Sequence, residues 1–241
     1  MFALNNWRLR PCGNWHWPSE VAVVTGGCGG IGKQLVLGLR EKDVKVVILD
    51  LLPLSAEFEG ESSILYIKTD ITSVEAIAIA AERIRKTFGP PSILINSAGL
   101  ATPHSILDTP PGYLSKIFGR DAYMALPSMV DSCASKAAGL TFHEGLNSEL
   151  KTKYKVDGVI TTIVQPSWVR TPMSQDNADD IERAQGKMLT PEEVAEAVLA
   201  HIWSRRGGQV ILPKGSTFFT TLQGWPNWAQ ELLRDMMGRA I

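Results

Sequence analysis

Cysteine is scarce in this chain. Its 241 residues include 3 cysteines, Cys12, Cys28 and Cys133, which are widely spaced and odd in number. Such a set predicts neither a disulfide framework nor a zinc site. We therefore expect a protein that holds no metal and works in a reducing compartment, the cytoplasm.

Long apolar runs and an excess of one charge are also missing. No stretch approaches the roughly 18 apolar residues of a membrane-spanning helix, and no apolar signal-peptide core opens the chain. The formal net charge is −1, which predicts no general attraction to nucleic acid or acidic membranes. We find no internal repeat. These absences leave a globular protein, and the composition, 44% hydrophobic and 20% charged, fits one α/β domain with a substantial core.

A glycine-rich turn organises this domain. The apolar, mostly β-branched run Val21–Val24 predicts a buried parallel strand, and Lys33–Arg40 has helical spacing. The glycines between them let the backbone turn sharply and approach a phosphate, and the following helix offers free N–H groups and a positive dipole end. We interpret this stretch as a dinucleotide site; the alternative is a tight turn that binds nothing.

Asp50 strengthens this interpretation. It ends a second apolar strand, Val46–Leu49, where its carboxylate is placed to accept hydrogen bonds from an adenosine ribose. The carboxylate would repel a 2′-phosphate, and the turn carries the uncharged Cys28, so NAD is favoured over NADP. Arg40 and Lys45 are near in sequence and keep NADP open.

Strands and helices are expected to alternate along the rest of the chain. Ser73 is a candidate N-cap for a helix over 74–88, and Thr190-Pro191 starts another that runs to Trp203. The remaining expected elements are strands at 64–67, 93–95, 158–165 and 209–212 and a long helix over 131–154. The pattern predicts a single Rossmann-type, doubly wound parallel sheet flanked by helices.

At Asn96-Ser97-Ala98-Gly99 the sequence comes to resemble the short-chain dehydrogenase/reductase family, NAD(P)-dependent Rossmann-fold oxidoreductases. Thr25-Gly26-x-x-x-Gly30-Ile31-Gly32 matches that family's cofactor turn, and Asp70-Ile71 matches its adenine contact. The tetrapeptide matches the family's Asn-Asn-Ala-Gly element, with Ser97 in place of the second Asn.

The resemblance continues to about residue 215. Ser135-Lys136-Ala137-Ala138 matches the helix of the catalytic lysine, and Pro166–Pro172 resembles the Pro-Gly-x-Val-x-Thr loop with Ser167 replacing Gly. The stretch 130–146 looks most like fungal members near the retinol-dehydrogenase-like branch. The resemblance implies these cofactor-binding residues: Thr25, Gly26, Gly30, Ile31, Gly32, Asp50, Asp70, Ile71, Asn96, Ala98, Gly99, Lys136, Val169 and Thr171.

The catalytic tyrosine of the family is absent. It would lie four residues, one helical turn, before Lys136, and Ser132 stands there. The family pattern also breaks between Gly119 and Tyr123, where a helix with the catalytic Asn and the central fifth strand with the catalytic Ser are expected. We expect a fold that lacks this strand or replaces it, either with Arg120–Leu126 or by closing Val159–Val164 against Ile93–Ile95.

The candidate catalytic residues are therefore Lys136 and Ser132. A lost general acid costs about 10²–10⁴ in rate. We expect an oxidoreductase that moves a hydride between NAD(P) and a small alcohol or carbonyl substrate with impaired machinery. The alternatives are a non-redox pseudoenzyme, a secondary-metabolism enzyme that reuses the cleft, or an inactive truncated form. A homodimer is in doubt because the lost helix packs between subunits in this family.

We divide the chain into an N-terminal arm (1–19), the dinucleotide-binding and catalytic domain (20–215) and a C-terminal amphipathic segment (216–241). The arm carries Trp7, Trp15 and Trp17, expected to pack on the domain, with a partner or membrane surface as the alternative. The last segment repeats apolar residues at helical spacing and is expected to pack on the domain or a subunit, because its polar side is not basic. Those residues are Trp225, Trp228, Leu232 and Met236.

Overall fold

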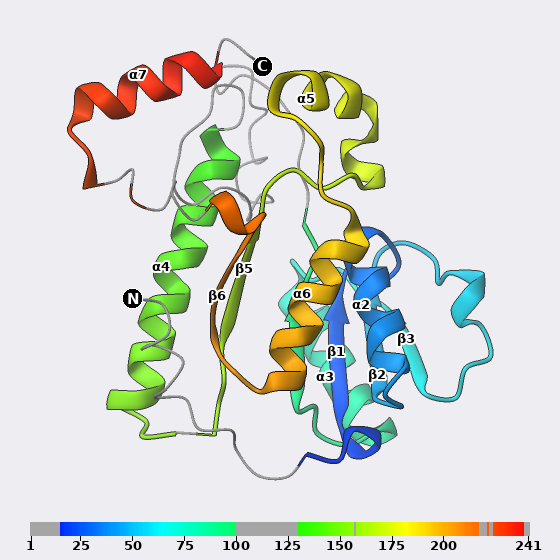
Figure 1. Ribbon diagram of the computed structural model, residues 1–241. Helices are drawn as coiled ribbons and strands as arrows, with labels where there is room; N and C mark the ends of the chain where they lie inside the picture. Colours follow the sequence, from blue (N-terminus) through cyan, green and yellow to red (C-terminus); the bar gives the residue numbers. More distant parts are fainter. Residues whose placement is uncertain (1–14, 100–129, 157, 217–220, 222–223, 239–241) are drawn as a thin grey trace. The chain divides into compact units, whose positions relative to one another are not determined.

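The computed structural model describes residues 15–99, 130–156, 158–216, 221 and 224–238 (Figure 1). They belong to two compact units, which we describe separately. The first unit comprises residues 13–98 together with Pro191–Ala200, and the second comprises residues 1–12, 99–190 and 201–241. One of the points at which the chain passes from one unit to the other lies within a helix, α6 (Pro191–Ser204).

The first unit is built on a four-stranded parallel sheet. Its strands are β1 (Val21–Thr25), β2 (Lys45–Asp50), β3 (Ile64–Lys68) and β4 (Ile93–Asn96). They lie in the order β3-β2-β1-β4, all parallel. The chain winds outward from β1 to β3 and then returns to the other side of β1. This is the predicted doubly wound arrangement, with its switch point between β1 and β4.

Helices cover both faces of this sheet because its strands are apolar on both sides. Val21 and Val23 share a buried cluster with Ala80 and Ile84 of α3 (Val74–Thr87). The helix α2 (Gly30–Arg40) contacts β1 and β2 and buries Leu35, Val36 and Leu39; Figure 1 shows it beside β1. The predicted α/β class and parallel sheet are confirmed.

The helix starts in this unit follow the sequence signals. The Ser73 side chain accepts a hydrogen bond from the amide of Ala76, which caps α3 as predicted. Pro191 opens α6, and Gln34 of α2 donates to Glu192 of α6 over 2.7 Å. Two short 3₁₀ turns, η1 (Trp17–Ser19) and η2 (Ala56–Phe58), complete the unit.

The arm residues Trp15 and Trp17 are half-buried. Their rings contact each other, with centroids 5.5 Å apart. Trp7 lies outside the described residues.

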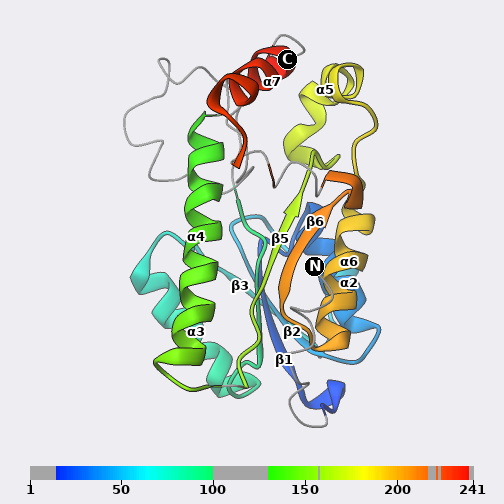
Figure 2. The same cartoon turned by 60° about the vertical axis from the view of Figure 1, so that its left-hand side comes forward.

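The second unit contains a two-stranded parallel sheet, β5 (Thr162–Pro166) with β6 (Gly208–Leu212). The two strands run side by side in Figure 2. The long helix α4 (Val130–Thr152) contacts β5. The turn η5 (Pro172–Asn177) and the helices α5 (Ala178–Gln185) and α7 (Asn227–Gly238) complete its described elements.

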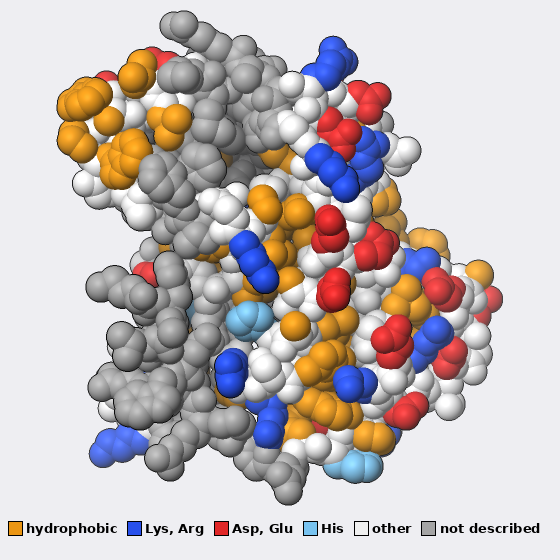
Figure 3. Space-filling view, in the orientation of Figure 1, with side chains coloured by type: hydrophobic (Ala, Val, Ile, Leu, Met, Phe, Trp, Pro, Cys, Tyr) orange, Lys and Arg blue, Asp and Glu red, His pale blue; other side chains and the backbone are white. Residues whose placement is uncertain are grey.

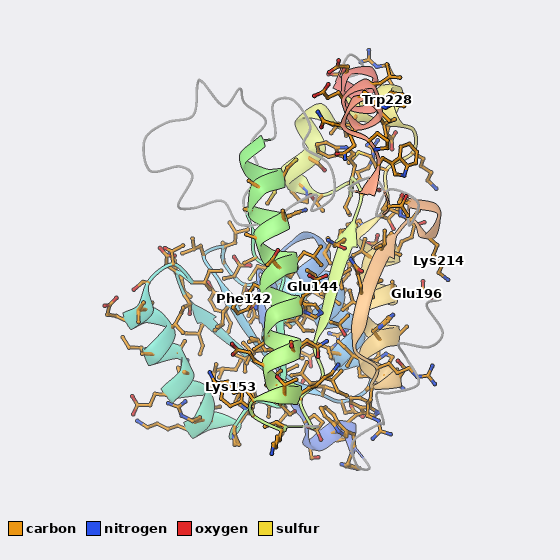
Figure 4. All side chains as sticks on the ribbon, turned by 90° about the vertical axis from the view of Figure 1, so that its left-hand side faces the viewer. Phe142, Glu144, Lys153, Glu196, Lys214 and Trp228 are labelled. Carbon is orange, nitrogen blue, oxygen red and sulfur yellow. The ribbon has the colours of Figure 1, made fainter. Side chains whose placement is uncertain are left out.

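One expectation needs correction here. The strand expected from Gly158 begins at Thr162, because the register pairs that residue with Gly208, the first residue of β6. The long helix predicted over 131–154 is observed as α4, on which Leu146 is 36% exposed and Phe142, labelled in Figure 4, is 71% exposed. The polar segment 176–183 is largely helical, in η5 and α5.

The replacement of the fifth strand stays a prediction. The break between Gly119 and Tyr123 and the segment 120–126 lie outside the described residues. The described pairing of β5 is with β6.

The helix α7 presents apolar side chains at its surface. Trp228 and Leu232 are 70% and 57% exposed, and Figure 3 shows hydrophobic side chains gathered over α7. Trp225 is half-buried. Packing on the domain is therefore not observed at Trp228 and Leu232, and a contact with another subunit stays a prediction.

Candidate nucleotide-binding site

The carboxyl ends of β1 and β4 are joined by one side chain. The hydroxyl oxygen of Thr25 accepts hydrogen bonds from the amides of Ser97 (3.2 Å) and Ala98 (3.1 Å). Thr25 is buried, so its hydroxyl supplies the acceptor that these two amides need away from water. It thereby fixes the spacing of the two chains at the switch point, where α/β proteins bind their ligands.

Gly26 and Gly32 are required by close packing. Gly26 has φ of +70°, and a Cβ there would lie 2.7 Å from Cα of Ala98. A Cβ on Gly32 would overlap the carbonyl of Gly26. Both glycines hold the turn tightly between β4 and the first turn of α2.

Gly29 differs from Gly26 and Gly32 because its side-chain position is open. A Cβ at this position would meet nothing within 4 Å, and its backbone is extended, with φ of −151°. Gly29 is the N-cap of α2, and no side chain caps the helix there. The first amides of α2 have no partner within the helix, and a side chain at its N-cap would meet open space.

The carboxylate of Asp50 is fixed by two backbone amides. Its Oδ2 accepts from the amide of Cys28 (2.9 Å) and its Oδ1 from the amide of Leu52 (3.0 Å). The amide of Gly26 also donates to the carbonyl of Leu49 over 2.9 Å. These bonds tie the glycine turn to the end of β2 and hold the acid beside it.

This negative charge changes the acidity of its neighbours. Burial, the charge of Asp50 and a hydrogen bond to it together raise the pKa of the Cys28 thiol to about 12. Burial, with Cys28 and Asp50, also raises the pKa of Tyr66, whose hydroxyl donates to the carbonyl of Leu52 over 2.7 Å. Both groups stay protonated at neutral pH, so neither adds a negative charge beside the carboxylate of Asp50.

The basic residues near in sequence lie at the other end of their elements. Arg40 ends α2, about 15 Å along the helix from Gly30, and pairs with Glu61 at 3.1 Å. Lys45 begins β2, about 16 Å along the strand from Asp50, and lies 5.9 Å from the ring centroid of Phe88. Neither is placed beside the carboxylate.

Two other lysines lie nearer the turn. Lys33 pairs with Glu57 at 2.7 Å. Lys68 stands opposite Asp50 in the β2–β3 register, and its side chain is exposed.

The remaining predicted residues of this unit follow β3 and β4. The carboxylate of Asp70 accepts from the amide (2.9 Å) and hydroxyl (2.7 Å) of Thr72. Ile71 is 38% exposed, and Asn96 ends β4 with an exposed side chain. They lie at the same carboxyl edge of the sheet as the glycine turn.

The predicted residues Gly99, Ser132, Lys136, Val169 and Thr171 belong to the second unit. Ser132 lies in α4 one turn before Lys136, as the spacing predicts, and the Lys136 side chain is half-buried. Val169 is fully buried and Thr171 half-buried, in the extended segment between β5 and η5.

The described residues offer no metal site. In that part of the chain, no three His, Cys, Asp or Glu side chains gather closely enough to hold an ion. His143 of α4 has its pKa lowered by burial, against the opposing charge of Glu144. No helix among the described residues is both long and apolar enough to cross a membrane.

Two contributors to the site were not predicted from the sequence. The amide of Cys28 donates to Asp50, and nothing in the sequence signals such a bond. The hydroxyl of Ser174 bonds the backbone at Val169 and Thr171. Its signal was available, because Thr171-Pro172-Met173-Ser174 has the spacing of a capping box with proline at the first position.

The sequence is similar to those of known dehydrogenases. The family model described as "short chain dehydrogenase" matches residues 20–120. The fungal protein "Dehydrogenase RED2" of Cochliobolus heterostrophus is 32% identical over 181 residues, which cover 63% of this chain and 68% of that protein.

Solved structures agree on the fold. A 4-hydroxyisoleucine dehydrogenase complexed with NADH has a TM-score of 0.71 at 17% identity, covering 80% of this chain and 96% of that one. A short chain dehydrogenase from Bacillus anthracis has a TM-score of 0.69 at 20% identity, covering 88% of this chain and 100% of that one.

Proposed function

The chain belongs to the short-chain dehydrogenase/reductase family of oxidoreductases, and on this basis we propose that it binds NAD(P) at the turn after β1. The observation that carries the proposal is the open space at Gly29, above the uncapped start of α2. A pyrophosphate fits such a place because helix N-terminal amides and the helix dipole favour an anion. The 4-hydroxyisoleucine dehydrogenase of similar fold is complexed with NADH, which supports the same proposal.

Each part of the cofactor would contact a different set of residues. The amides of Ile31 and Gly32 would hold the pyrophosphate, the Asp50 carboxylate the adenosine ribose, and Asp70 with Ile71 the adenine. The nicotinamide end would meet the residues that the family pattern gives it, which are Asn96, Ala98, Gly99, Lys136, Val169 and Thr171. Each carries over from the family pattern at its matching position.

NAD is the cofactor we favour. Asp50 is held beside the turn by two amides, and a carboxylate there accepts from ribose hydroxyls but repels a 2′-phosphate. Arg40 and Lys45 lie at the far ends of α2 and β2. Lys68, opposite Asp50 in the register, is the residue that would have to hold the phosphate of NADP.

The proposed reaction is hydride transfer to or from a small alcohol or carbonyl compound. The nicotinamide supplies or accepts the hydride. Lys136 would grip its ribose, and Ser132 is the hydroxyl one turn away where the family uses a phenol. A phenol titrates near 10, and a neighbouring cation brings it into working range, whereas an alkyl hydroxyl is far more basic. We therefore propose slow turnover.

A second candidate is cofactor binding without redox chemistry. Ser132 in place of the tyrosine favours it, and the family model's match ends at residue 120, just where the sequence departs from the family pattern. In that case the inherited cleft would serve a regulatory role or another reaction of secondary metabolism, or the chain would be an inactive truncated form. A cytoplasmic location is a further part of the proposal. A homodimer is not, because the sequence lacks the helix that packs between subunits in this family.

The test uses the open position at Gly29. NADH and NADPH are titrated against the full chain, with binding followed by fluorescence and thermal unfolding. We expect NADH to bind more tightly and to raise Tm. Gly29→Glu should weaken NADH binding tenfold or more, because its carboxylate enters the space of the pyrophosphate. Gly29→Ser is the matched control: serine is a preferred N-cap and adds no charge.

Each outcome of this titration favours a different conclusion. Binding that survives Gly29→Glu would overturn the assignment of the pyrophosphate to this turn. A broad melt that neither nucleotide sharpens would favour the inactive form. Binding with no NADH oxidation across a broad panel of carbonyl compounds would favour the second candidate.

A further inference from the structure

The segment after β5 is closed on itself by backbone hydrogen bonds. Val169 forms a parallel bridge with Leu189. The amide of Arg170 donates to the carbonyl of Leu189 over 2.8 Å, and the amide of Leu189 donates to that of Trp168 over 2.9 Å. The chain thus leaves β5, passes through η5 and α5 (Figure 1) and returns beside its own starting point.

One buried hydroxyl holds the inner turn of this segment. Oγ of Ser174 donates to the carbonyl of Val169 over 2.7 Å and accepts from the amide of Thr171 over 3.0 Å. The carbonyl of Thr171 is a second acceptor at 3.1 Å, but the single hydroxyl hydrogen favours the shorter bond to Val169. Ser174 is 7% exposed, so the bonds are sheltered from competing water.

The two backbone groups that Ser174 bridges belong to Val169 and Thr171. These are the residues that the family pattern assigns to the cofactor. A carbonyl and an amide two residues apart are held by one side chain, which fixes the extended backbone between them. Ser174 of η5, which is not among the predicted cofactor-binding residues, thereby holds the backbone of two residues that are.

A charged side chain supports the same segment from outside. Arg170 pairs with Glu182 of α5 at 2.9 Å and lies 3.8 Å from Asp179. The other carboxylate oxygen of Glu182 accepts from the amide of Met188 over 3.2 Å. Both bonds favour the charged carboxylate and lower the pKa of Glu182, the bond from Met188 more strongly. Glu182 therefore links the two ends of the returning segment.

We propose that Ser174 is a positioning residue for the nicotinamide end of the cofactor, holding Val169 and Thr171 in their contact geometry, with Glu182 supporting it through Arg170. The inference rests on the proposed function, since it assumes that the chain binds NAD(P). It adds a role for residues that lie outside the family's motif.

The experiment compares two ligands that differ in one part. NADH carries the nicotinamide, and ADP-ribose lacks it. We expect Ser174→Ala to weaken NADH binding about tenfold, the effect of one lost sheltered hydrogen bond and a loosened backbone. Its affinity for ADP-ribose should match that of the unmodified chain. Ser174→Thr, which keeps a hydroxyl, should restore most of the NADH affinity.

Two further variants guard the interpretation. Ser204→Ala removes an exposed hydroxyl that bonds the carbonyl of His201 in its own helix, and it should change neither affinity. Glu182→Gln removes the charge while its amide oxygen can still accept from Met188. It should weaken NADH binding about threefold, and it keeps the inference testable if Ser174→Ala does not fold.

The two affinities of Ser174→Ala decide the inference. Selective loss of NADH affinity supports it. Equal loss of both ligands, or loss of neither, overturns it while leaving the proposed function intact. If the unmodified chain binds neither NADH nor ADP-ribose, the proposed function fails and the inference fails with it.

Discussion

At the scale of single residues, the acid at the end of β2 dominates its surroundings. Asp50 accepts from the amides of Cys28 and Leu52, and its charge helps to raise the pKa values of Cys28 and Tyr66. A half-buried thiol beside a carboxylate is costly to ionise. The thiol of Cys28 is therefore uncharged at physiological pH, and its ionisation affects the stability of the fold only at alkaline pH.

This predicts a dependence on pH. The folded pKa of Cys28 is about 12, against an ordinary value of 9.0. Above pH 9 the unfolded chain loses the thiol proton while the folded chain keeps it, so the unfolded state binds fewer protons and stability falls as pH rises toward 12. Cys28→Ser should show a shallower decline in urea unfolding between pH 8 and 10.5. Parallel declines in the two proteins would contradict this, because Tyr66 titrates in both.

Sequence and structure agree best at the glycines. Gly26 and Gly32 were predicted from the family motif. The structure gives the steric reason for them, because a Cβ would lie too close to Ala98 at Gly26 and to the Gly26 carbonyl at Gly32. The hydrogen bonds of Cys28 and Ser174 were not found. The amide of Cys28 can donate to many acceptors, and only the folded chain selects Asp50. The bonds of Ser174 did have a signal in the sequence, the capping-box spacing from Thr171.

At the scale of elements, local signals were reliable where the ends of a helix carry their own chemistry. Ser73 caps α3 and Pro191 opens α6 as predicted. Signals that depend on a neighbour were less reliable. The apolar residues Val159 and Ile160 suggested an earlier start for β5, but pairing begins only at Thr162, where β6 supplies a partner.

The cap of α3 can be tested directly. The Ser73 oxygen accepts from the amide of Ala76 over 3.2 Å. Ser73→Ala should lower the free energy of unfolding by about 1 kcal/mol, the usual cost of a lost N-cap. Ser73→Asp should retain the stability, because aspartate caps equally well and favours the helix dipole. Urea unfolding checks both variants, and equal stability of Ser73→Ala and the unmodified chain would show that the bond contributes nothing.

At the scale of the whole molecule, the proposed cofactor-binding residues are spread along the chain from Thr25 to Thr171. Residues of the first unit would hold the adenine half of the cofactor, and Lys136 with the segment after β5 belongs to the second. The resemblance to the family predicts which residues hold each part of the cofactor, and this assignment stays a prediction. The predicted loss or replacement of the family's fifth strand also stays a prediction, because residues 100–129 lie outside the described part of the chain.

We expect the chain to bind NADH but to reduce carbonyl compounds slowly. With Ser132 in place of the tyrosine, NADH-dependent carbonyl reduction should run about 10²–10⁴ times slower than in a family member with the full set of catalytic residues. Stopped-flow measurement of NADH oxidation with the chain in excess separates this chemical step from product release. A rate within tenfold of that family member would mean that another group supplies the proton.

The bond between the Cys28 amide and Asp50 has a consequence for how a ligand arrives. The loop that would wrap the phosphates is already fastened to the neighbouring strand end through this bond and the one from Gly26 to Leu49. A nucleotide would therefore bind a turn that hydrogen bonds already hold in place, so that ordering the turn on binding would cost little free energy. Association should be limited by diffusion and orientation, and differences in affinity between nucleotides should appear in how quickly they leave.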